Sequence, residues 1–142
     1  MTTSAPQFQP ALTRAPTQAG PAAYGVRVIL RLEGFAAFAT ALLLYAHAGF
    51  SWPIFALLFL APDLSMLAYL AGPRIGAFGY NLMHTYTLAF APVLAGFVGG
   101  APLLTAVGLI WIAHIGFDRA LGYGLKYPTR FGDTHLGRRG LR

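Results

Sequence analysis

The chain has 142 residues, of which 56% are hydrophobic and only 10% are charged, and its mean hydropathy is +0.58. Soluble globular proteins carry about a quarter charged residues, so this composition excludes an ordinary soluble domain and indicates an integral membrane protein. The absence of cysteine excludes disulfides, thiolate zinc sites and cysteine nucleophiles. The net charge of +6 comes from basic residues that flank apolar stretches, which favours anionic lipid headgroups of the bilayer over nucleic acid as the partner.

Composition divides the chain into three parts. Met1 to Ala23 is rich in Pro, Ala, Thr and Gln and has no periodic apolar face, which predicts a disordered N-terminal tail. Residues 24–125 form the predicted transmembrane domain. Residues 126–142 form a predicted basic, cytoplasmic C-terminal tail.

The transmembrane domain contains four hydrophobic stretches, each close to the ~20 residues that cross the hydrocarbon core of a bilayer. Short joints with Gly or Pro separate the stretches, so sequential neighbours should run antiparallel. We therefore predict an all-α membrane protein with four antiparallel transmembrane helices in an up-and-down bundle. The predicted spans are Tyr24 to Ala48, Trp52 to Ala71, Ile75 to Val98 and Pro102 to Gly124.

The basic residues predict the orientation of this bundle. In a four-span topology all ten fall on one side of the membrane, because the first and third joints hold none. Lys and Arg concentrate in cytoplasmic segments, so both termini should be cytoplasmic. The ten residues are Arg14, Arg27, Arg31, Arg74, Arg119, Lys126, Arg130, Arg138, Arg139 and Arg142.

Each predicted helix also carries a polar or ionisable residue at a similar depth. At about 1.5 Å per residue, these groups lie roughly 10 to 17 Å from the cytoplasmic end of their helices. A charge that faces lipid is costly, so the groups should turn inward and share one cavity. They are Glu33, Asp63, Asn81, His84, His114 and Asp118.

Local spacing sharpens this prediction. His114 and Asp118 are four residues apart and Asn81 and His84 are three apart, so each pair lies on one helix face. Pro62 precedes Asp63 and predicts a kink of the second helix there, which would either open space at the acid or serve packing alone.

Two imidazoles and two carboxylates form a suitable shell for zinc or manganese, with positions left for water. We predict Asp63, His84, His114 and Asp118 as the metal ligands and Glu33 as a general base or fifth ligand. Such a site would favour hydrolysis of a lipid-like or phosphate ester. The predicted supporting and phosphate-binding residues are Asn81, Arg31, Arg74, Arg119 and Lys126.

Other interpretations use the same residues. A metal-free chain of Asp, Glu and His would suit a small proton-coupled transporter, and hydrogen bonds between helices would suit a structural or regulatory membrane protein without activity. The fourth span carries a ridge of small residues that predicts a homodimer or close packing within the bundle: Gly116, Ala120 and Gly124. Asp133 and His135 either fold back to the site or stay solvated.

The stretches "FLAPDLSMLAYLAGPRIGAFGYNLMHTY" and "WIAHIGFDRALGYGLKYPT" resemble a bacterial family of integral membrane proteins known as domain of unknown function 4260. The resemblance implies a four-span membrane protein and supplies no activity. We expect a multi-pass protein of the bacterial inner membrane. The order "PD", "HT" and "H" followed four residues later by "D" also resembles the membrane-bound metal-dependent hydrolase family. That resemblance implies the same four ligands. Ser65 replaces a second acid of that pattern, which favours one metal over two.

Overall fold

The computed structural model of the chain describes residues 21–138. Positions 1–20 of the predicted N-terminal tail lie outside these described residues. The described part is mostly helical and ends in two short paired strands. Its elements are α1 (Pro21–His47), α2 (Trp52–Leu58), the 3-10 helix η1 (Ala61–Ala71), α3 (Pro73–Met83), α4 (Tyr86–Val98), α5 (Pro102–Leu121), β1 (Asp133–Thr134) and β2 (Gly137–Arg138).

Three helical stretches are long and apolar enough to cross a membrane. They are Tyr24–His47, Trp52–Ala71 and Pro102–Leu121. These stretches coincide with the first, second and fourth predicted spans, so the length and hydrophobicity expected of those three are confirmed.

The third predicted span, Ile75 to Val98, is not one continuous helix, and that prediction is wrong. α3 ends at Met83 and α4 begins at Tyr86, while Thr85 between them is extended, with φ −101° and ψ 132°. No proline or glycine marks this interruption in the sequence. Pro92, the strongest local helix breaker of the segment, lies inside α4 without ending it.

The second span changes its helical geometry at the predicted position. α2 ends at Leu58, and the chain continues as η1, a 3-10 helix of 11 residues in which Pro62 is the second residue. Proline has no amide proton to donate and tolerates the first turn of a new helical segment, which explains why the α-helix does not run through it. The helical geometry therefore changes beside Asp63, where the sequence predicts a kink.

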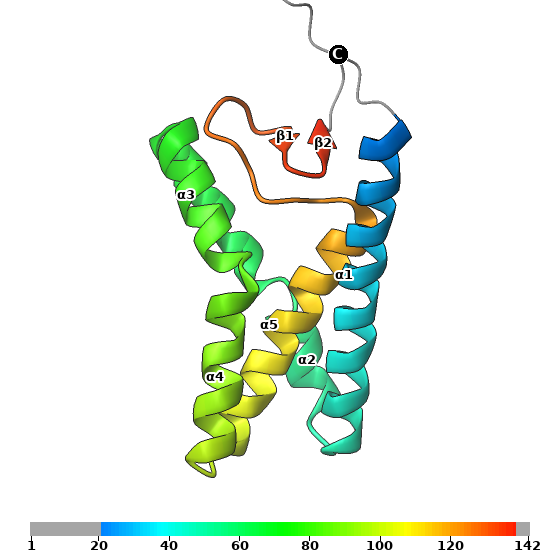
Figure 1. Ribbon diagram of the computed structural model, residues 1–142. Helices are drawn as coiled ribbons and strands as arrows, with labels where there is room; N and C mark the ends of the chain where they lie inside the picture. Colours follow the sequence, from blue (N-terminus) through cyan, green and yellow to red (C-terminus); the bar gives the residue numbers. More distant parts are fainter. Residues whose placement is uncertain (1–20, 139–142) are drawn as a thin grey trace, which may run out of the picture.

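α5 is the central helix of the molecule and packs against both α1 and α4 (Figure 1). Close approach of α1 and α5 depends on two glycines, Gly34 and Gly116. A Cβ atom at Gly116 would lie 2.6 Å from the backbone nitrogen of Phe38 and 2.7 Å from the carbonyl oxygen of Gly34. The buried core around this contact includes Ala41, Tyr45, Ala89, Ile110 and Ala113.

The segment after α5 folds back over one end of the molecule. β1 and β2 pair antiparallel, with Asp133 opposite Arg138, and an isolated bridge joins Lys126 to Thr134 (Figure 1). The Thr129 hydroxyl and the Arg138 guanidinium donate hydrogen bonds of 2.8 Å to the Asp133 carboxylate. These bonds lower the pKa of Asp133 and hold it ionised.

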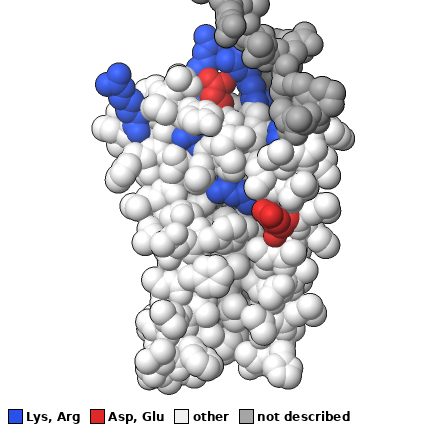
Figure 2. Space-filling view, in the orientation of Figure 1, with Lys and Arg blue, Asp and Glu red and all other residues white. Residues whose placement is uncertain are grey.

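The two ends of the molecule differ in charge. The first turns of α1 and α3 lie at the same end as the strands, while the α1–α2 and α4–α5 connections lie at the opposite end (Figure 1). Figure 2 shows the Lys and Arg side chains of the visible face gathered toward the strand end, whereas the opposite end of that face is uncharged. The interruption that separates α3 from α4 falls between these ends (Figure 1), and the polar residues Asp63 and His84 lie at the start of η1 and the end of α3.

Candidate metal centre

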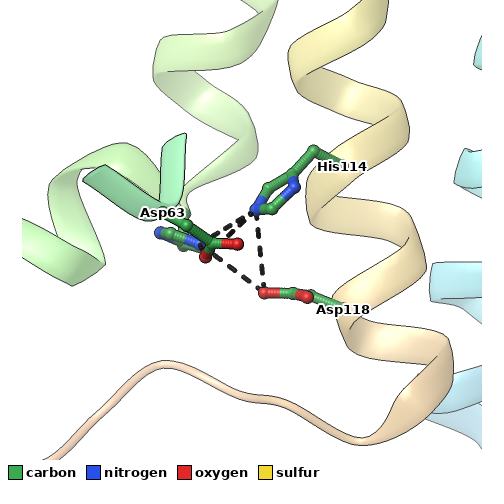
Figure 3. A group of neighbouring side chains, drawn as sticks. Asp63, His114 and Asp118 are labelled. Atoms are coloured by element: carbon green, nitrogen blue, oxygen red, sulfur yellow. Dashed lines mark hydrogen bonds and ion pairs between the residues drawn. The ribbon is translucent and has the colours of Figure 1, made fainter. Parts of the chain in front are cut away.

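Four ionisable side chains from three elements meet beside α5. Asp63 comes from the first turn of η1, His84 caps the C-terminus of α3, and His114 and Asp118 come from α5 (Figure 3). One ligand atom from each residue lies within 4.8 Å of the corresponding atom of every other. The structure therefore brings together the four residues that the sequence proposed as metal ligands.

The spacing of these atoms suits a single ion. His84 Nε2 lies 3.4 Å from Asp63 Oδ1, 3.5 Å from Asp118 Oδ2 and 3.2 Å from His114 Nε2. His114 Nε2 lies 3.6 Å from Asp63 Oδ1 and 3.9 Å from Asp118 Oδ2. Zinc bonds of about 2.0–2.2 Å to nitrogen and oxygen, arranged tetrahedrally, separate the ligand atoms by about 3.3–3.6 Å. These five separations fall close to that range, and the sixth, between the two carboxylates, is within 4.8 Å.

His84 is held in an orientation that directs Nε2 into the cluster. Its Nδ1 lies 2.9 Å from the carbonyl oxygen of Tyr80, and its ring stacks on the Tyr80 ring with centroids 3.7 Å apart. A carbonyl only accepts hydrogen bonds, so Nδ1 carries the proton, and in a neutral ring Nε2 carries the lone pair. This backbone partner is of the kind that fixes metal-binding histidines.

His114 leaves one ring nitrogen without a partner. Its Nε2 faces the cluster, while its Nδ1 is buried with no hydrogen-bond partner among residues 21–138. With neutral rings, the cluster holds acceptor atoms that face one another: two carboxylate oxygens and the lone pair of His84. A neutral His114 can donate through Nε2 to the His84 lone pair 3.2 Å away, and a cation among these atoms would offset the charge of the two carboxylates.

The burial of the cluster is uneven. His84 and His114 are 2% and 1% exposed, whereas the side chains of Asp118 and Asp63 are 16% and 37% exposed. The Tyr80 hydroxyl donates a hydrogen bond of 3.2 Å to Asp118 Oδ2, which occupies part of that carboxylate. Asp63 is therefore the most accessible of the four side chains.

The interruption between α3 and α4 is stabilised by donors from α5. Trp111 Nε1 donates to the carbonyl oxygen of Met83 at 2.6 Å, and Arg119 Nη2 donates to that of His84 at 3.1 Å. The Tyr80 carbonyl accepts the bond from the His84 ring. Side chains thus satisfy the carbonyls of Met83 and His84, which a continuous helix would satisfy with its own amides, while the Tyr80 carbonyl also accepts the His84 backbone amide at 2.9 Å.

Asn81 and Lys126 attach the segment after α5 to the cluster. The Asn81 side chain donates to the Lys126 carbonyl at 2.9 Å and accepts from the Lys126 amide at 2.7 Å. Lys126 Nζ donates to the carbonyl of Phe131 at 3.0 Å and lies 4.7 Å from the centroid of the Tyr80 ring. Burial lowers the pKa of Lys126. Asn81 is thus a structural support and not a ligand.

The other residues predicted for the site lie outside the four-residue group. Glu33 is exposed on α1 and Arg74 is exposed in the first turn of α3. Arg31 donates through Nε to the carbonyl of Ala120 at 2.8 Å, and Arg119 contacts the His84 carbonyl. Arg119 and Lys126 donate to backbone carbonyls around the cluster, and their role in binding phosphate stays a prediction.

Asp133 and His135 fold back without joining the ligand group. His135 Nδ1 accepts a hydrogen bond of 2.9 Å from the Leu125 amide, and the Arg119 guanidinium lies 3.4 Å from the His135 ring. Burial and the nearby Arg119 charge lower the pKa of His135, so its ring is neutral at neutral pH. Asp133 pairs with Arg138 at 2.8 Å.

The ridge of small residues is already used within the chain. Gly116 packs against Gly34 and Phe38 of α1, and a Cβ atom at Gly124 would lie 2.6 Å from the His135 ring. Ala120 is half-buried. These contacts support the packing interpretation of the ridge, and the homodimer through it stays a prediction.

Two residues around the cluster were not expected from the sequence, Tyr80 and Trp111. Tyr80 lies four residues before His84, and Trp111 lies three residues before His114. Each spacing places the aromatic residue on the same helix face as the histidine. The spacing in the sequence therefore predicts that Tyr80 and Trp111 lie beside the histidines. It does not reveal which groups their hydroxyl and indole N–H bind.

Comparison with known proteins gives a family and no activity. No curated protein and no solved structure matches the chain. None of these comparisons supports the resemblance to metal-dependent hydrolases. The family described as Domain of unknown function (DUF4260) matches residues 27–139, which include the whole cluster. The chain therefore belongs to the DUF4260 family.

Proposed function

We propose that the protein binds one divalent transition-metal ion, zinc or manganese, through Asp63, His84, His114 and Asp118. The observation that carries this proposal is the convergence of four ligand atoms within 4.8 Å of one another. His and carboxylate ligands suit both ions. Two carboxylates also balance the charge of a divalent ion, which a buried site between helices requires.

The same site suggests hydrolysis of a lipid-like or phosphate ester. A divalent ion in such a shell supplies Lewis acidity and lowers the pKa of bound water toward neutrality. Asp63, the most exposed ligand, lies on the side from which water and a substrate would approach. Glu33 lies outside the four-residue group, so as a general base it would act on water or substrate and not as a fifth ligand.

The proposal includes a membrane topology. Four passes through the bacterial inner membrane, with both termini cytoplasmic, would place the basic end of the molecule at the anionic inner leaflet. The third pass would consist of α3 and α4 in series. The gathering of Lys and Arg toward one end supports this orientation (Figure 2).

The interrupted third pass also raises the alternative of a proton-coupled transporter, because transporters often use broken helices at their ion sites. In such proteins the carbonyls freed by the break coordinate the transported ion. Here Trp111 and Arg119 donate to the freed carbonyls of Met83 and His84. This arrangement favours a fixed site over a transport path.

Elemental analysis of the detergent-purified protein tests the proposal. We expect about one zinc or manganese ion per chain, which His114→Ala and Asp63→Ala should both remove. His47→Ala is the matched control, because His47 is exposed at the end of α1 and outside the ligand group. A folded wild type that takes up neither ion after reconstitution would reject the metal site. Hydrolysis is then tested by a screen of lipid phosphoesters with the metal-loaded protein.

A further inference from the structure

A second polar site lies at the basic end of the molecule, formed by α1, the end of α5 and β2. Three arginines line a cavity of about 220 Å³ there: Arg27 and Arg31 from one face of α1, and Arg138 from β2. Tyr24, Gly122 and Gly137 also line it. None of its residues belongs to the metal-ligand group, so a ligand in this cavity is independent of the proposed metal site.

Two of the guanidinium groups are oriented by bonds through Nε. Arg31 Nε donates to the carbonyl of Ala120 at 2.8 Å, and Arg138 Nε donates to Asp133 at 2.8 Å. Each bond fixes a side chain while the planar group keeps two further nitrogens for a ligand. The geometry is that of a fork prepared for an anion with several oxygens.

The described lining of the cavity is basic. Its described lining contains three arginines and no carboxylate. Asp133, which pairs with Arg138, offsets one of these three positive charges from outside the lining. Guanidinium groups around one small cavity repel one another, and a bound anion would remove that repulsion.

Glycine at position 137 permits the close approach of Arg27. Gly137 has φ +120°, a conformation that other residues rarely adopt, and a Cβ atom there would lie 3.0 Å from Arg27 Nη1. Glycine therefore gives this turn its positive φ and leaves room beside the end of the Arg27 side chain.

We propose that this cavity binds the phosphate group of an anionic phospholipid. α1 is long and apolar enough to cross a membrane, and Arg27 and Arg31 lie near its N-terminal end, which the topology proposed above would place beside the headgroups. Soluble phosphate has the same chemistry, and the experiment distinguishes the two sources.

The test is a titration of the purified full chain in detergent with phosphatidylglycerol, with retained lipid counted by native mass spectrometry. Arg27→Gln should weaken binding about tenfold, because it removes one charge-assisted contact. Arg74→Gln is the matched control, because it removes one exposed charge of α3 outside the cavity. Gly137→Ala should also weaken binding, although it changes no charge. Circular dichroism and thermal unfolding verify that each variant is folded.

Several results would overturn the proposal. Equal weakening by Arg27→Gln and Arg74→Gln would show diffuse attraction of an anionic lipid to a basic surface. Retention of phosphatidylglycerol no greater than that of phosphatidylcholine would remove the anionic-lipid preference. Displacement of the lipid by millimolar inorganic phosphate would identify soluble phosphate as the ligand instead of a headgroup. If Arg27→Gln does not fold, Gly137→Ala decides the outcome.

Discussion

Replacing Asp118 with asparagine should abolish the stabilisation of the protein by metal while changing little else. Asn has nearly the same size and keeps an oxygen that accepts the hydrogen bond from Tyr80, which is 3.2 Å long in the wild type. The change removes one of two negative charges from the ligand group. A divalent ion would then be only half neutralised in a buried site, and a good ligand would become a poor one.

The magnitude comes from binding linkage. Metal at one hundred times its Kd stabilises the folded state by about 2.7 kcal/mol, which for a chain of this size corresponds to roughly 5–10 °C in Tm. A variant that binds about a hundredfold more weakly would gain only about 0.4 kcal/mol at the same concentration. The wild type should therefore respond clearly to zinc or manganese, and Asp118→Asn should respond hardly at all.

Thermal unfolding in detergent, followed by circular dichroism with added metal or with a chelator, measures this difference. Asp133→Asn is the matched control: Asp133 is also an acid, but it pairs with Arg138 outside the ligand group, so its variant should keep the full metal response. The reasoning would be refuted if neither metal nor chelator shifts the wild-type Tm while Asp118→Asn lowers it equally under both conditions. That result would identify the cluster as His–Asp ion pairs.

Three further predictions concern the scaffold. Gly34→Ala should destabilise the fold by about 1–3 kcal/mol, because its Cβ atom would clash with α5, whereas Gly25→Ala in the same helix meets open space and should gain up to about 1 kcal/mol; thermal unfolding of both variants tests the pair. Asn81→Ala should cost about 1–3 kcal/mol and speed hydrogen exchange in the segment after α5, which mass spectrometry detects. Arg138→Ala should raise the pKa of Asp133 toward 3.8, which a carbon NMR titration measures. Because the pKa of Asp133 is lowered in the folded state, its contribution to the stability of the hairpin is present above pH 3.8 and is lost as the pH falls through the folded-state pKa.

The four candidate ligands were predictable from the sequence because the spacing within one helix places two of them side by side. His114 and Asp118 are four residues apart in an apolar helix, and helical geometry alone places them on one face. The cost of exposing charge to lipid then required partners on other helices, and those helices offered few ionisable residues. Asp63 was further marked by Pro62, where α2 gives way to η1.

The interruption at His84 was not predictable from local sequence. The stretch "MHTY" contains no proline or glycine, and only Thr85, a residue type favoured before a helix, hints at a new start. The helix ends there because Trp111 and Arg119 of α5 supply donors to its last carbonyls. Those donors are 28 and 35 residues distant in sequence from the carbonyls they bind, so the segment alone does not reveal them.

α5 acts as the template on which the cluster is assembled. It supplies two of the four candidate ligands, His114 and Asp118. It also supplies two hydrogen-bond donors, Trp111 and Arg119, which stabilise the interruption after α3 where a third candidate ligand lies. Positions 111, 114 and 118 share one face of the helix, since they are separated by three and four residues. The opposite face carries Gly116, which lets α1 pack closely behind. A single amphipathic pattern in α5 thus explains why a helix apolar enough to cross a membrane retains a tryptophan, a histidine and an aspartate in register: each contacts a group that another interrupted helix exposes.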